Sequence, residues 1–183
     1  MEKAYLFLAD GFEEVEGLTV ADLLRRAEVP AVMVSITGKK SITGSHGIKT
    51  EADALFEETA FDDGTVFILP GGMPGTTALK EHGGLQQLLC DQFEKGKRIA
   101  AICAAPTALG RFGILKGKKA TCYPGLEDGL TGAEPVQDPV VTDGSVTTSR
   151  GVGTAIPFAL ELIRLLCGSE KADRIANSIV YRK

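Results

Sequence analysis

Cys103 is the residue whose neighbours point most directly to chemistry. It lies between an apolar, strand-like run at residues 98–102 and a helix-favouring run at 104–112, with the small residues Ala101 and Ala105 on either side. A nucleophile on such a sharp strand-to-helix turn stands exposed at the edge of a sheet. The free N–H groups and the positive end of the helix then face the sulfur. We therefore expect a lowered thiol pKa and a reactive thiolate at Cys103.

The loops after two other predicted strands carry groups that suit this cysteine. An acidic run with Glu13, Glu14 and Glu16 follows the first strand, and Pro70-Gly71-Gly72 follows the strand at 65–69. In an open parallel sheet, ligands bind beyond the carboxyl ends of the strands, so these loops belong on one rim with Cys103. Bare glycine backbone can present N–H groups to an oxyanion, and a glutamic acid kept protonated by a neighbouring anion can donate to a thiolate. The residues by themselves leave the choice among the three glutamates open.

The elements that must position these groups follow from the pattern of apolar residues. Strand-like runs alternate with runs of helical periodicity, which predicts βαβ units and a mainly parallel sheet with helices on both faces. Two further segments are typical of hairpins, the second because Asp143-Gly144 is a strong two-residue turn signal. We predict strands at 3–9, 31–36, 65–69 and 98–102, helices at 14–27, 85–95 and 104–112, and hairpins at 41–50 and 140–148. A further helical face is formed by Leu160, Ile163, Leu166 and Cys167.

Composition narrows the class of protein. With 183 residues, 44% of them hydrophobic, the chain has enough apolar material for one core, so we expect a single domain over residues 1–183. A net charge of −4 with scattered lysines argues against nucleic-acid binding. No apolar stretch is long enough for a membrane span, and the first one is too short for a secretion signal. Four cysteines without a C-x-x-C pair indicate neither a disulfide framework nor a zinc site. We expect a cytoplasmic protein without metal or cofactor.

Four short motifs, taken together, resemble one known family. The strings Glu-Glu-Val-Glu at 13–16, Leu-Pro-Gly-Gly at 69–72, Ala-Ala-Ile-Cys-Ala-Ala-Pro at 100–106 and Ser-Arg-Gly-Val-Gly-Thr at 149–154 occur in the order found in the ThiJ/PfpI superfamily. The chain is most similar to its DJ-one subfamily, over nearly the whole length. The resemblance implies a flavodoxin-like three-layer sandwich and a homodimer.

The same resemblance assigns roles to individual residues. Cys103 matches the reactive cysteine of the family, and Glu16 matches its protonated partner. The backbone N–H groups of Gly72 and Ala104 match its oxyanion pocket. The family is associated with glyoxalase and deglycase activity on glyoxals and glycated groups, and with peroxide sensing through oxidation of the cysteine.

One position departs from the pattern of the glyoxalase-competent members. Where those members carry a histidine after the strand that follows the elbow helix, this sequence has Tyr123, as expected for a bacterial-type member that lacks the histidine. A phenol titrates near 10 and is a poor proton shuttle at neutral pH. A protease is disfavoured because the protease-like members have a histidine directly after the cysteine, where this chain has Ala104. A kinase is disfavoured because the chain has no G-x-x-x-x-G-K-[ST] motif.

Several side chains have two interpretations. His46 is either a plain hairpin residue or, by resemblance, a basic residue near an anion-binding recess. Arg150 either pairs with a carboxylate, which we favour, or holds a ligand anion. Cys103 taken alone can also be a small buried apolar residue, and Glu16 an exposed acid in a first helical turn. The turn at 151–153 lacks the third glycine of a dinucleotide motif, since Ile156 stands there, which excludes a nicotinamide site.

Two functions of different classes remain open. In the first, peroxide oxidises Cys103 to a sulfinate, and the protein serves in the response to oxidative or carbonyl stress as a sensor or protective factor. In the second, the Cys103 sulfur adds to a small aldehyde such as methylglyoxal, or to a glycated group, giving a hemithioacetal as in a glyoxalase or deglycase. Tyr123 favours the first function, and whether the protein is an enzyme stays open.

Overall fold

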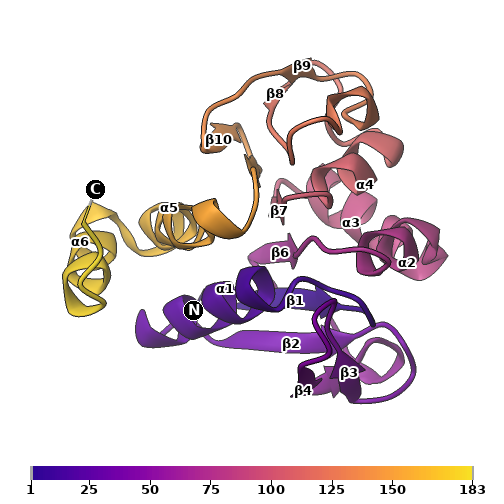
Figure 1. Cartoon of the computed structure of the whole chain (residues 1–183), viewed down its shortest axis with the longest axis horizontal. Coiled ribbons are helices and arrows are strands. Elements are labelled where there is room, and N and C mark those ends of the chain that lie inside the picture. The colour runs from indigo at the N-terminus through magenta and orange to yellow at the C-terminus, as the bar shows by residue number, and fades with distance from the viewer. Residues whose placement is uncertain (1, 183) are drawn as a thin grey trace.

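The computed structural model describes residues 2–182 and is built around one seven-stranded sheet (Figure 1). Neighbouring strands in this sheet are parallel, except that β10 and β11, at one edge, are antiparallel. From one edge to the other, the strands are β10 (Val140–Asp143), β11 (Val146–Ser149), β7 (Arg98–Ile102), β6 (Val66–Leu69), β1 (Ala4–Leu8), β2 (Ala31–Ser35) and β5 (Ala54–Leu55).

Helices cover both faces of this sheet. One face is packed by α1 (Glu14–Arg26) and α5 (Ala155–Cys167), with α6 (Ser169–Ser178) against α5, and the other by α2 (Gly75–Glu81), α3 (Gly83–Glu94) and α4 (Pro106–Arg111) (Figure 1). Successive side chains of a strand point to opposite faces, so Leu6 and Leu8 enter the first core while Tyr5 and Phe7 enter the second. This double burial explains why β1 reads as an unbroken apolar run.

Short elements complete the chain. A hairpin of β3 (Ser41–Thr43) and β4 (Lys49–Glu51) stands beside the sheet, and β8 (Lys119–Ala120) pairs with β9 (Glu134–Pro135). Three single 3₁₀ turns occur at η1 (Phe56–Glu58), η2 (Glu127–Gly129) and η3 (Val152–Thr154). At the tip of the β10–β11 hairpin, Gly144 has a φ of +62°, the left-handed backbone that the Asp143-Gly144 signal predicted.

The α/β, flavodoxin-like, three-layer fold expected from the sequence is confirmed. The predicted strands and hairpins lie within one or two residues of their observed ends. The elbow helix is shorter than predicted, because α4 begins at Pro106 rather than at residue 104. The helices α2 and α6 were not predicted; α2 is only seven residues long and opens with glycine and two threonines, which are weak helix formers. In the described part of the chain no helix combines the length and apolarity that a membrane crossing requires.

The packing of the core between the sheet and the helices α1 and α5 predicts a large loss of stability when a buried side chain there is truncated. Phe158 in α5 is fully buried in this core. Because Phe158→Ala leaves a cavity under the sheet, we expect it to lower the free energy of unfolding by about 3–5 kcal/mol, measured by urea denaturation. The control Arg174→Ala, on the exposed side of α6, should change it by less than about 0.5 kcal/mol. Equal effects of the two substitutions would contradict this account of the core.

Candidate active site

Cys103 stands directly after β7, on a sharp turn with strained backbone. Its φ is +66°, a left-handed conformation that residues other than glycine rarely adopt. The turn is held on both sides: the N–H of Cys103 donates to the carbonyl of Ser149 at 3.0 Å, and the N–H of Tyr123 donates to the carbonyl of Cys103 at 2.8 Å. The end of β11 and the loop after β8 therefore fix the position of the sulfur.

Glu16 meets this cysteine from α1. Its side chain is fully buried, and its Oε2 accepts the N–H of Gly71 at 2.9 Å. A Cβ atom on Gly71 would lie 2.5 Å from Cys103 Cβ and 2.7 Å from Glu16 Oε2, so only glycine fits between them. The other oxygen, Glu16 Oε1, is buried without a hydrogen-bond partner among the described residues. Of the three glutamates in the acidic run, Glu16 is thus the one that lies beside Cys103 across Gly71.

Burial governs the titration of this pair. Burial raises the pKa of Glu16 to about 7; hydrogen bonds from Cys103 and the N–H of Gly71 oppose the rise, and the charge of Glu13 adds to it. Burial also raises the pKa of the Cys103 thiol to about 12; the charge and hydrogen bond of Glu16 add to the rise, while the N–H groups of Ala104 and Gly72 oppose it. The sequence-based prediction of a lowered thiol pKa at Cys103 is therefore wrong in direction. The loss of water around the sulfur raises the thiol pKa more than the two N–H groups lower it. The helix α4 contributes little because it begins at Pro106, which has no N–H group to donate.

The two groups consequently titrate as a coupled pair that gains its first negative charge around pH 7. The direction of both pKa shifts places that charge on the Glu16 carboxylate and keeps Cys103 a thiol. Moving one proton gives the alternative expected from the sequence, a protonated Glu16 donating to a Cys103 thiolate. A carboxylate whose pKa lies near 7 is suited to take the proton of the thiol as the sulfur attacks.

A cavity of about 540 Å³ opens beside the pair. Among the sequence candidates, Tyr123 and Arg150 lie in its wall, and Tyr123 is half-exposed. Arg150 donates to the carbonyl of Gln137 at 3.0 Å and lies 4.0 Å from a carboxylate oxygen of Glu127. These contacts match the pairing with a carboxylate that the sequence analysis favours for Arg150. The cavity is lined by Glu13, Glu16, Cys103, Tyr123, Pro124, Arg150, Gly151, Val152, Gly153 and Thr154.

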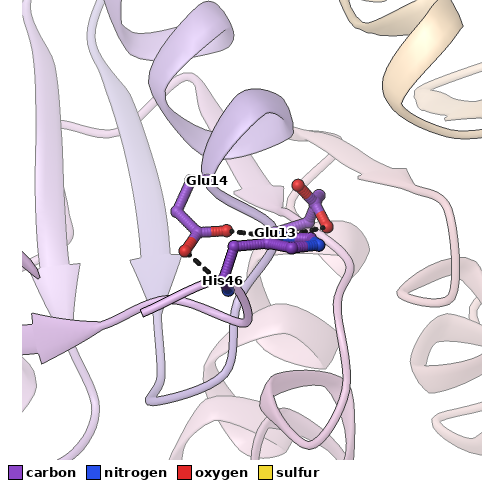
Figure 2. Close-up of side chains that lie close together, drawn as sticks. All are labelled: Glu13, Glu14 and His46. Carbon is purple, nitrogen blue, oxygen red and sulfur yellow. Dashed lines mark hydrogen bonds and ion pairs between the residues drawn. The ribbon is translucent and has the colours of Figure 1, made fainter. Parts of the chain in front are cut away.

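His46 lies outside this wall, in a cluster with two glutamates that the sequence analysis did not identify (Figure 2). Its Nδ1 lies 3.1 Å from Glu14 Oε2 and 3.5 Å from Glu13 Oε2. Burial opposes ionisation of Glu14, but hydrogen bonds from its own N–H, from His46 and from Ile48 lower its pKa to about 2. Glu14 therefore ties the β3–β4 hairpin to the start of α1. Pairing of residues 32 positions apart leaves no local signal in the sequence.

The other three thiols differ from Cys103 in their surroundings. Cys122 is buried, and burial raises its pKa to about 11. Cys167 is exposed at the end of α5, and Cys90 is half-buried on α3. Among the four cysteines, only Cys103 lies in the cavity wall with a carboxyl partner.

The raised pKa of Glu16 predicts a pH-dependent stability difference. An acid with a raised folded-state pKa contributes stability below its unfolded value of 4.5 that is lost as the pH rises through about 7. Glu16→Gln can still accept the N–H of Gly71 but cannot ionise. Its free energy of unfolding should therefore rise relative to wild type between these pH values, by up to about 3 kcal/mol in urea denaturation. A difference that is constant with pH would show that Glu16 ionises normally.

Comparisons with known proteins agree with the family resemblance of the sequence motifs. Residues 2–165 match the model of the DJ-1/PfpI family. The Drosophila melanogaster protein named dj-1beta is 37% identical over 181 residues, covering 98% of this chain and 97% of that protein. A Pyrococcus abyssi protein named a deglycase is 33% identical over 167 residues, covering 90% of this chain and 99% of that protein. The structure of oxidized Toxoplasma gondii DJ-1 superposes with a TM-score of 0.96 at 33% identity, with full coverage of both chains.

Longer relatives also match. The Arabidopsis thaliana protein named DJ-1 homolog B is 37% identical over 183 residues, which are 99% of this chain but 42% of that protein. The chain thus spans less than half the length of this relative and nearly all of the Drosophila protein. Family model, relatives and solved structures agree with the motifs found in the sequence, and the chain belongs to the DJ-1/PfpI family.

Proposed function

We propose that this DJ-1-like protein senses or removes peroxide through oxidation of Cys103 to a sulfinate. The observation that carries the proposal is the environment of the sulfur. The buried carboxylate of Glu16 is placed to take its proton, and the N–H groups of Gly72 and Ala104 face it. Such donors stabilise negative charge that arrives on the sulfur or on oxygen atoms bound to it.

The chemistry needs only peroxide. Glu16 takes the thiol proton as the sulfur attacks one peroxide oxygen; the O–O bond breaks, and the departing hydroxide receives that proton and leaves as water. The product is a sulfenic acid. A second peroxide molecule transfers another oxygen in the same way and leaves as water, and the sulfinic acid ionises to a sulfinate. A half-exposed Tyr123 in the cavity wall leaves room for peroxide.

Oxidation should be selective for Cys103 and depend on Glu16. After limited hydrogen peroxide, we expect peptide mass spectrometry to find two added oxygen atoms on Cys103 before Cys90, Cys122 or Cys167 is modified. The rate should rise with pH around a midpoint near 7, where Glu16 becomes able to accept the thiol proton. Glu16→Gln should slow oxidation at least about tenfold. Glu57→Gln, at an exposed glutamate, is the matched control. Equal oxidation of all four cysteines would refute the sensing function.

A second function is supported by the free oxygen of Glu16. Glu16 Oε1 has no partner in the described structure, so it can accept a proton from a hydroxyl of a bound adduct. The Cys103 sulfur would add to the aldehyde carbon of a small α-oxoaldehyde or to a glycated group, and its proton would pass to Glu16. The same N–H groups would stabilise negative charge on the hemithioacetal oxygen. The P. abyssi relative named a deglycase is consistent with this chemistry.

The aldehyde function predicts turnover of methylglyoxal to a hydroxy acid that Cys103→Ser and Glu16→Gln abolish. Tyr123→His would place a group that titrates near 6.5 in the cavity wall, so we expect it to raise kcat at neutral pH. Product formation by enzymatic detection of lactate is the measurement. An inert wild-type protein, assayed beside a histidine-bearing relative that is active, would remove this function and leave sensing. The cytoplasmic location, the homodimer and the single domain over residues 1–183 remain predictions under either function.

A further inference from the structure

A second group of ligand-type side chains lies beside the Cys103 cavity. Glu13 and Glu14 come from the start of α1 and His46 from the turn of the β3–β4 hairpin, and Figure 2 shows the imidazole lying against both carboxyl groups. One ligand atom from each of the three residues lies within 4.8 Å of the others. The hydroxyl of Ser45 joins them, 3.2 Å from an oxygen of each glutamate.

The two carboxyl groups differ from ordinary surface acids. The Glu14 side chain is only 3% exposed and that of Glu13 only 13%. Glu14 Oε1 accepts the backbone N–H groups of His46 at 2.8 Å and of Ile48 at 3.3 Å, which fixes the orientation of the carboxylate. Its Oε2 is left facing Glu13 and the imidazole. The donor atoms are therefore preorganised by the hairpin backbone.

We propose that Glu13, Glu14 and His46 form a binding site for a divalent transition-metal cation, with Zn²⁺ the best match. Imidazole nitrogen together with carboxylate oxygen is a donor set that this ion commonly takes, and the Ser45 hydroxyl or water can complete four ligands. The cation would replace the Nδ1 proton of His46 between the two carboxylates. His46 is 69% exposed, so the site is open to solvent on that side. Because Glu13 also lines the cavity of Cys103, the cation would stand at its rim.

Metal titration of chelator-treated full-length protein tests this proposal. We expect calorimetry to show one Zn²⁺ bound per chain, with affinity at least tenfold weaker in His46→Ala and in Glu13→Gln. Both replaced side chains lie outside the packed core, and circular dichroism checks that the variants fold. The matched control is His82→Asn at the only other histidine, because asparagine can keep the cap that His82 provides to α3.

Cobalt(II) as a second probe separates this site from the thiols. Binding at the glutamate–histidine site should give only weak visible bands, whereas ligation by Cys103 or another cysteine would add intense near-ultraviolet thiolate bands. The proposal is overturned if thiolate bands account for the bound cobalt, if His46→Ala and Glu13→Gln bind Zn²⁺ as wild type does, or if wild type binds none at millimolar metal. Glu14 is left unchanged because its substitution would also release the hairpin.

Discussion

The candidate site depends on the close approach of a buried carboxyl group and a thiol. Glu16 comes from the first turn of α1 and Cys103 from the turn after β7, and the missing side chain of Gly71 allows them to meet. Each group, once ionised, makes ionisation of the other more costly, because little water is present to screen them. A pair that can move one proton between its two groups is suited to either proposed reaction.

The parallel sheet makes this approach possible. The ends of β1, β6 and β7 lie side by side, so the loops that follow them meet at one rim although they are far apart in the chain. The sheet is buried on both faces, which supplies a rigid platform for the strained backbone of Cys103. Hydrogen bonds to Ser149 and Tyr123 then hold the turn from the two neighbouring segments. The strained backbone of Cys103 persists because these neighbouring segments fix its position.

The basic side chains near the cavity already have polar partners within the protein. Arg150 contacts the carbonyl of Gln137 and the carboxylate of Glu127, and His46 contacts Glu13 and Glu14. Arg150 is the one basic side chain among the residues that line the cavity. This arrangement explains why burial dominates the pKa values of the pair. It also makes Glu13 a shared residue, since it lines the cavity and contacts His46.

Some of this could be predicted from the sequence, because it is encoded locally. Unbroken apolar runs identify strands buried on two faces, Asp143-Gly144 identifies a hairpin turn, and the residues around Cys103 identify an elbow. The family resemblance pointed to Glu16, although the residues by themselves could not distinguish it from Glu13 or Glu14. Only the tertiary structure decided that the thiol pKa rises and that His46 contacts two glutamates instead of lining the cavity. These properties depend on how far folding removes water from each group and on contacts between residues that are distant in the chain. Neither can be read from a local stretch of sequence.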